Sequence, residues 1–157
     1  MAKQYLFLFF CFCAFSSTHA QTITTIAGDG TYGFFGDGGP ATGARFQYIW
    51  YLALGDVNSL YFTDNSNHRI RKINGAGIIS TFSGTGVSAY GGEGGQATAA
   101  TFIGASGIAV DGTGNLYFAD VSNHRVRKVN TSGVISTVAG TGIAGYSGDG
   151  GPSTAAQ

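Results

Sequence analysis

Cysteine and charge are both scarce in this sequence. Only Cys11 and Cys13 occur among its 157 residues, and both lie within the first twenty. The remainder of the chain therefore has no disulfide framework, no thiolate zinc site and no cysteine nucleophile. Eight basic residues balance eight acidic ones, and only 10% of residues are charged. This balance lacks the basic footprint of a nucleic-acid-binding domain or a polybasic membrane patch.

Proline is also rare, whereas glycine is abundant, with 2 and 27 residues respectively. The glycines follow no strict period of three, which excludes a collagen-like chain. Hydrophobic residues make up 43% of the sequence and the formal net charge is zero. Intrinsic disorder requires the opposite composition, so we expect a folded chain.

The first twenty residues have the three parts of a secretory signal peptide. Lys3 supplies the positive charge, residues 5–15 form an apolar run, and a short polar stretch ends at Ala20. The run is shorter than the roughly 20 residues that a membrane-spanning helix needs. We therefore expect cleavage before Gln21, a secreted protein that is extracellular or periplasmic, and no stable membrane span after cleavage.

A repeat of 56 residues covers the sequence beyond this segment. Residues 22–77 align without gaps with residues 78–133, and 24 of the 56 positions are identical. A third copy starts at Val134. Periods of this length are typical of solenoids, propellers and other repeat arrays.

Each period contains four short runs of β-branched and aromatic residues. In the second copy these runs are residues 107–111, 116–120, 125–130 and 134–139. Their lengths suit strands, and the segments between them are short enough for antiparallel hairpins. Four such strands form one propeller blade, so we predict an all-β fold, a β-propeller of four-stranded antiparallel blades. The 137 residues after Ala20 (157 − 20) correspond to about 2.4 periods.

The second copy resembles a known repeat family. Residues 118–142, FADVSNHRVRKVNTSGVISTVAGTG, resemble the NHL repeat. The glycine-rich extension at 140–156 is similar to the variant of secreted bacterial proteins and teneurin-type surface proteins. The resemblance implies a propeller of about six blades, hence roughly 336 residues. We therefore expect the present sequence to be an N-terminal fragment of such a protein.

The period also predicts how the chain is divided. Residues 1–20 are the signal peptide, and residues 21–157 form a partial propeller. Within it we expect a lone outer strand at 22–27, one blade at 47–83, a second blade at 103–139 and an incomplete inter-blade loop at 140–157.

The strand order brings the second hairpin turn of each blade and the glycine-rich loops to one face of the propeller. Loops on a rigid scaffold commonly carry function. The candidate binding residues on this face are Asp37, Asn67, His68, Glu93, Asn123, His124 and Asp149. Identical placement in successive blades also fits a purely structural turn. We assign that structural role to Asp64 and Asp120, as acceptors for turn amides or neighbouring arginines.

Metal and cofactor sites are not predicted. The loops with GDGG or GEGG sequence lack the Asp-x-Asp-x-Asp pattern of a dedicated calcium site, and no His-x-x-x-His spacing suggests zinc, so both metals are weak alternatives. The basic strands at 69–72 and 125–128 are expected to pair with the structural aspartates or to face solvent, not to bind RNA.

Two functions remain open. The first is a secreted or cell-surface scaffold that binds a protein or glycan partner. The alternative, implied by the resemblance, is a metal-dependent lyase or lactone hydrolase on a six-bladed NHL-like propeller. No catalytic residue is predicted: Asp56 and Asp111 lie near the ends of the innermost strands, but these strands carry no histidine.

The first copy departs from the second at residues 50–55, where we expect an atypical turn.

Overall fold

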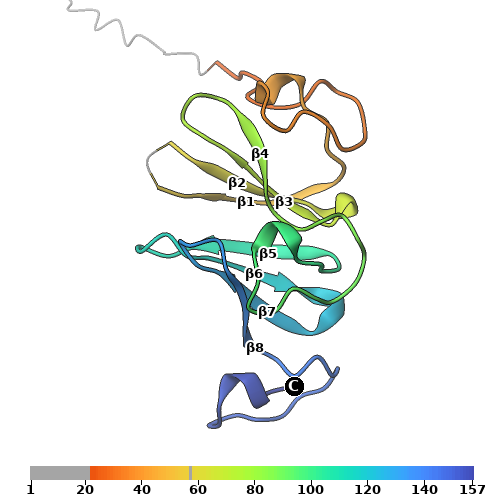
Figure 1. The fold of residues 1–157 in the computed structure, drawn as a ribbon, viewed down its shortest axis with the longest axis vertical. Helices are drawn as coiled ribbons and strands as arrows, with labels where there is room; N and C mark the ends of the chain where they lie inside the picture. Colours follow the sequence, from red (N-terminus) through yellow and green to blue (C-terminus); the bar gives the residue numbers. More distant parts are fainter. Residues whose placement is uncertain (1–21, 57) are drawn as a thin grey trace, which may run out of the picture.

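The computed structural model describes residues 22–56 and 58–157, so the predicted signal peptide lies outside the described residues. Eight strands form two antiparallel sheets of four (Figure 1). The first sheet, blade 1, contains β1 (Ile49–Leu54), β2 (Leu60–Asp64), β3 (Arg69–Ile73) and β4 (Ile79–Ser83). The second, blade 2, contains β5 (Ala105–Val110), β6 (Leu116–Asp120), β7 (Arg125–Val129) and β8 (Ile135–Ala139).

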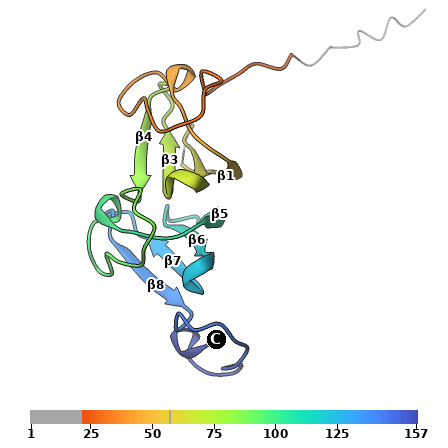
Figure 2. The same ribbon diagram turned by 90° about the vertical axis from the view of Figure 1, so that its right-hand side faces the viewer.

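The all-β blade architecture predicted from the repeat is confirmed. Each sheet is an up-and-down meander, and the two sheets are stacked one on the other (Figures 1 and 2). The first strand of blade 2 begins two residues before the predicted run, because Ala105 and Ser106 pair with Asp120 and Ala119. It ends at Val110, so Asp111 belongs to the hairpin turn.

An apolar core joins the two blades. Blade 1 contributes Tyr61 and Ile70, and blade 2 contributes Leu116, Phe118 and residues of the preceding loop. These side chains alternate along their strands, so each sheet presents one apolar set to its neighbour. Burial of this shared core is the main force that holds the blades together.

The glycine-rich loops protect the outer edge of the following blade. In the loop at 84–101, Gly94 N–H donates to the Ile135 carbonyl at 2.9 Å, and Ile135 N–H donates to the Gly95 carbonyl at 3.0 Å. Gly38 and Gly39 make the same pair of bonds with Ile79. The loop backbone thus satisfies part of an otherwise open strand edge.

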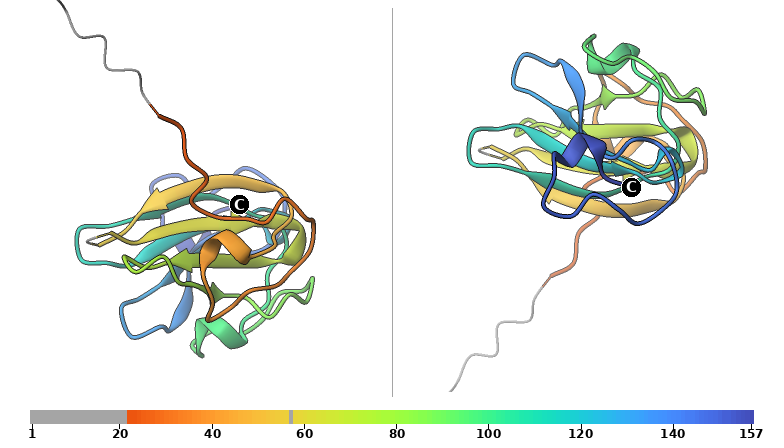
Figure 3. Two further views of the ribbon diagram at one scale, coloured as in Figure 1. Left: turned by 90° about the horizontal axis from the view of Figure 1, so that it is seen from above. Right: turned by 90° about the horizontal axis from the view of Figure 1, so that it is seen from below.

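One short 3-10 turn lies in each glycine-rich loop. These turns are η1 (Ala41–Gly43), η3 (Ala97–Ala99) and η5 (Ser153–Ala155). Two more, η2 (Asn65–Asn67) and η4 (Val121–Asn123), form the second hairpin turn of each blade. The loops at 28–45 and 140–157 lie at opposite ends of the stack (Figures 1 and 3).

Residues 22–27 pair with no strand in the described part of the chain, so the lone outer strand stays a prediction. No helix among residues 22–56 and 58–157 is long and apolar enough to cross a bilayer.

Candidate binding surface

Each blade contains a buried arginine–aspartate pair. In blade 1, Arg71 Nη1 lies 3.4 Å from Asp64 Oδ2, and both side chains are fully buried. Asp64 Oδ1 also accepts bonds from Gln47 N–H and Asn67 Nδ2, each at 2.8 Å. Buried charges are stable only when they are paired and hydrogen-bonded, and these contacts supply both.

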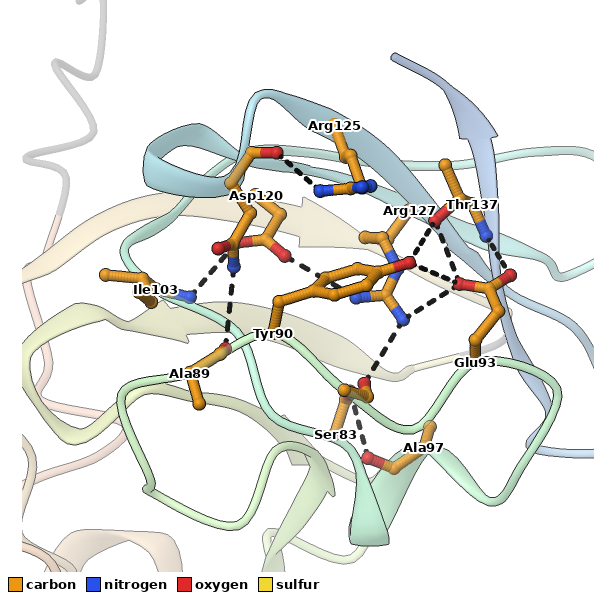
Figure 4. Close-up of polar contacts among 12 residues, drawn as sticks. Ser83, Ala89, Tyr90, Glu93, Ala97, Ile103, Asp120, Arg125, Arg127 and Thr137 are labelled. Atoms are coloured by element: carbon orange, nitrogen blue, oxygen red, sulfur yellow. Dashed lines mark hydrogen bonds and ion pairs between the residues drawn. The ribbon is translucent and has the colours of Figure 1, made fainter. Parts of the chain in front are cut away.

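Blade 2 repeats this arrangement (Figure 4). Arg127 Nη1 lies 3.5 Å from Asp120 Oδ2, while Asp120 Oδ1 accepts bonds from Ile103 N–H at 3.0 Å and Asn123 Nδ2 at 2.8 Å. Arg127 lies on β7 and Asp120 at the end of β6, so the pair ties neighbouring strands to each other. The two aspartates therefore lie where a structural role requires them.

The acidic residues of the glycine-rich loops extend these pairs outward. Asp37 accepts a bond from Arg71 Nη2 at 2.7 Å and another from the Thr81 hydroxyl at 2.7 Å. In blade 2, Glu93 accepts from Thr137 N–H and its hydroxyl, and lies 3.4 Å from Arg127 Nη2 (Figure 4). Both carboxylates are thus engaged within the blade.

The same contacts determine the protonation of these groups. Burial raises the pKa of the Asp64 and Asp120 carboxyl groups above the ordinary value, against the opposing hydrogen bonds and arginine charges. Burial also acts to raise the pKa of Glu93, but hydrogen bonds from Thr137 and the charge of Arg127 outweigh it and lower the pKa overall.

Asn67 and Asn123 connect the hairpin turns to the loops. Asn67 Nδ2 donates to the Gly33 carbonyl at 2.9 Å, and Asn123 Nδ2 donates to the Ala89 carbonyl at 3.5 Å. The second hairpin turn and the glycine-rich loop therefore lie side by side in each blade.

In the loops at 28–45 and 84–101, an aromatic ring stacks on an arginine of the basic strand. Phe34 lies 3.7 Å from the guanidinium carbon of Arg69, measured to the ring centroid, and Tyr90 lies 4.0 Å from that of Arg125. Such stacking stabilises a partly buried arginine by about 0.5–2 kcal/mol. Neither aromatic residue was singled out from the sequence, although their 56-residue spacing was available as a signal.

His68 and His124 occupy equivalent backbone positions. Both have left-handed φ, at 47° and 50°, where the 3-10 turn meets the third strand. His68 Nδ1 is buried without a hydrogen-bond partner in the described chain. His124 lines an open groove of about 340 Å³ on the far side of blade 2.

The remaining candidate, Asp149, lies in the third loop copy. It accepts a bond from the Tyr146 hydroxyl at 2.8 Å, as Glu93 does from Tyr90 at 3.2 Å. The candidate residues are therefore spread over three loops and two turns. Among the residues that the structure describes, no three His, Cys, Asp or Glu side chains are grouped to hold a metal ion.

Asp111, near the end of an innermost strand, is engaged in its own turn. Its carboxylate accepts bonds from Asn115 and from Thr113, as well as one from the Tyr117 hydroxyl at 3.1 Å. The Asn115 and Thr113 bonds hold the pKa of this carboxyl well below its ordinary value. In the first copy Gly55 takes this place, and a Cβ added there would meet the Tyr61 ring.

The clearest difference between the copies is an exposed aromatic run in blade 1. Tyr48, Trp50 and Tyr51 are 60%, 59% and 47% exposed. One period later the corresponding residues are Gly104, Ser106 and Gly107. Tyr48 also has a φ of 55°, a left-handed conformation that Gly104 adopts without strain at 67°. We call Tyr48, Trp50 and Tyr51 the aromatic patch.

The sequence showed this departure but not its exposure. An apolar run is also typical of a buried strand, so periodicity alone does not distinguish an exposed run from a buried one. The available signal was a bulky residue in one copy where the other copy has glycine. Because the two copies share a backbone, the fold does not require the bulky side chain.

Comparison with known proteins agrees with the repeat. Residues 85–146 match the family model of the Teneurin NHL domain. Teneurin-3 of Danio rerio is 35% identical over 106 aligned residues, covering 59% of this chain and 4% of that protein. Teneurin-3 of Mus musculus is 34% identical over the same length, with the same coverage. The chain thus corresponds to a small part of these relatives.

Solved structures superimpose on part of this chain. A Bacteroides thetaiotaomicron protein of unknown function is 28% identical, with a TM-score of 0.54 over 63% of this chain and 25% of that chain. Virginiamycin B lyase of Staphylococcus aureus is 26% identical with a TM-score of 0.44, which is too distant for an inference about activity. Residues 85–146, which the family model matches, include all of blade 2 and the start of the loop at 140–157. Residues 85–146 are therefore similar to the NHL domain of teneurins, and the described chain has the four-stranded antiparallel sheets of propeller blades.

Proposed function

We propose that this protein is an exported binding scaffold whose aromatic patch contacts a protein or glycan partner. The observation that carries the proposal is the exposure of Tyr48, Trp50 and Tyr51 at positions where the second copy has small residues. Tyrosine and tryptophan dominate the energetics of protein interfaces, and their flat rings also stack on the apolar faces of sugars. A rigid blade holds them at little entropic cost.

Backbone strain supports the same proposal. A non-glycine residue in the left-handed region costs of order 1–3 kcal/mol and is typical of functional sites. Tyr48 has this conformation, with its carbonyl held by Asn65 N–H at 3.2 Å. The rest of the blade thus fixes a side chain that the fold itself does not require.

The seven polar candidates are secondary in this proposal. Asp37, Glu93, Asn67 and Asn123 hold loops to blades, so we infer a supporting role for them. His68, His124 and Asp149 also recur with the period, so we infer that they contribute little to binding. The lyase or lactone hydrolase alternative has no observation in its favour here.

Trp50 provides a direct test because it is the only tryptophan in the sequence. The purified chain is titrated with a glycan library and with candidate extracellular proteins while tryptophan emission is followed. A ligand of the patch shifts or quenches this emission, whereas one that binds elsewhere leaves it unchanged. Ligands that bind by calorimetry without any change in Trp50 emission would contradict the assignment to the patch.

Export is part of the proposal and rests on the pattern of residues 1–20. Expression of the full sequence in an exporting bacterial host should yield protein that begins at Gln21. Mass spectrometry of the purified protein checks this, and an intact Met1 in the cytoplasmic fraction would contradict it.

A further inference from the structure

A cavity of about 400 Å³ lies between the two blades, near the hairpin turns that follow β1, β5 and β7. Blade 1 lines it with Tyr61, Lys72 and Phe82, and blade 2 lines it with Val110 and turn residues. Every lining residue lies between positions 56 and 133, within two consecutive blades, so the cavity does not depend on the residues before β1 or after β8. Its volume is in the range of small-molecule sites.

The comparison of the two blades shows that this cavity contains a tyrosine hydroxyl without a partner. In blade 2, the Tyr117 hydroxyl donates to Asp111 Oδ2 at 3.1 Å. In blade 1, Gly55 occupies the position of Asp111, so this carboxylate is missing. Tyr61 is only 6% exposed, and its hydroxyl has no hydrogen-bond partner in the described chain. A hydroxyl that is largely shielded from water needs an acceptor, which a ligand can supply.

Lys72 adds a positive charge beside this hydroxyl. It pairs with Tyr61 across β2 and β3, and its Nζ lies 5.2 Å from the centroid of the Tyr61 ring. Neither Lys72 nor Asp56 takes part in the ion pairs found among the described residues. An ammonium group and a hydroxyl group on one wall are suitable donors for a carboxylate.

The other walls of the cavity suit a small ring that carries hydroxyl groups. The Phe82 ring packs edge-on against Tyr61, with 4.8 Å between the centroids, and forms an apolar wall together with Val110. Asp56 lines the cavity from an exposed turn and offers acceptor oxygens. Asn130 uses its Oδ1 within its own turn, which leaves its Nδ2 as a donor. Apolar walls with a few polar groups are typical of ligand sites.

We propose that this inter-blade cavity binds a sugar acid. The ligand carboxylate lies against the Lys72 ammonium and the Tyr61 hydroxyl, in place of the aspartate that blade 2 has. A ring hydroxyl donates to Asp56, and the apolar face of the ring packs on Phe82. The aromatic patch lies at the start of β1 and Asp56 follows the end of that strand, so this is a second site, apart from the patch.

The test measures the binding of glucuronate to the full sequence, expressed in an exporting host, by isothermal titration calorimetry. Three further probes each lack one feature: glucose has no carboxylate, inorganic phosphate has no ring, and glutamate has no ring hydroxyls. We expect glucuronate to bind more tightly than any of the three, because only glucuronate can contact both the donors and the apolar wall.

Two variants and their equivalents one period later locate the site. Lys72→Met keeps an unbranched side chain on the Tyr61 ring but removes the charge, so the affinity for glucuronate should fall about tenfold or more. Tyr61→Phe keeps the ring in the core and should lower the affinity about twofold to tenfold. Lys128→Met and Tyr117→Phe are the matched controls and should bind like the wild type, because neither residue lines this cavity.

Trp50 distinguishes this site from the aromatic patch. It lies at the other end of β1, so glucuronate in the cavity should leave the tryptophan emission unchanged while calorimetry detects binding. Circular dichroism checks that all variants remain folded.

Four results would overturn the proposal. The wild type would bind no glucuronate, or would bind one of the three other probes as tightly. Lys72→Met and Tyr61→Phe would both bind glucuronate like the wild type. The control variants would lose as much affinity as these two, or glucuronate would change the emission of Trp50.

Discussion

At the residue scale, positions that recur with the 56-residue period stabilise each blade from within. Arg127 is fully buried and lies between Asp120 on one side and Glu93 on the other. Arg71 has the same surroundings in blade 1. Removing one member of a buried ion pair is much more costly than the pair is worth, because the other charge remains without a partner.

Arg127→Leu should therefore lower the free energy of unfolding by about 3–5 kcal/mol, since it leaves Asp120 charged and buried. Arg125→Leu is the matched control on the same strand. Its guanidinium donates to the Asn123 and Thr141 carbonyls and is partly exposed. We expect that change to cost about 1–2 kcal/mol. Urea unfolding measures both, and equal losses would contradict the structural role of Arg127.

Asp111 gives a prediction about pH. Hydrogen bonds from Asn115 and Thr113 lower the pKa of its carboxyl in the folded chain. Its stabilising effect is therefore complete above the unfolded pKa of about 3.9 and is lost as the pH falls toward the lower folded value. The stability advantage of the wild type over Asp111→Asn should shrink as the pH drops below about 4. An advantage that is constant between neutral and acidic pH would refute this.

At the scale of elements, the blade strands were predictable from the sequence because each is short, β-rich and bounded by turn residues. The edge pairing of the glycine-rich loops was not. Gly94 and Ile135 are 41 positions apart (135 − 94), and local pattern carries no information about such a contact. The start of β5 at Ala105 was missed for a similar reason, since its partner strand determines where it begins.

The glycines of these loops differ in what they require. Gly92 has a φ of 81° and a Cβ there would lie 2.6 Å from the Ala100 Cα atom. Gly94 has a φ of 75°, but a Cβ there would meet nothing within 4 Å. Gly94→Ala should cost about 1 kcal/mol from its backbone conformation alone. Gly92→Ala should cost about 2 kcal/mol or more, because the clash with backbone adds to that strain. Thermal unfolding of both variants distinguishes the two, and a larger loss at Gly94 would contradict the loop geometry.

At the scale of the whole molecule, the two blades share a backbone and differ in their surfaces. The repeat made the architecture predictable, including the side-by-side position of hairpin turns and loops. It also drew attention to residues that recur, such as Asn67 and Asn123, which the structure engages within the blades. The aromatic patch occurs once, so the repeat does not predict it. What recurs supports the fold, and what departs from the repeat is the better candidate for binding.

That claim is tested by binding measured side by side on two variants. The first, Tyr48→Gly with Trp50→Ser and Tyr51→Gly, gives blade 1 the residues of blade 2. The second, His68→Ala with His124→Ala, alters recurring residues only. Both are applied with the wild type to one glycan array and one set of immobilised extracellular proteins. The patch variant should lose about tenfold or more in affinity, as expected for removal of aromatic anchors, while the histidine variant stays close to the wild type. Retained binding by the patch variant, together with loss in the histidine variant, would contradict the account.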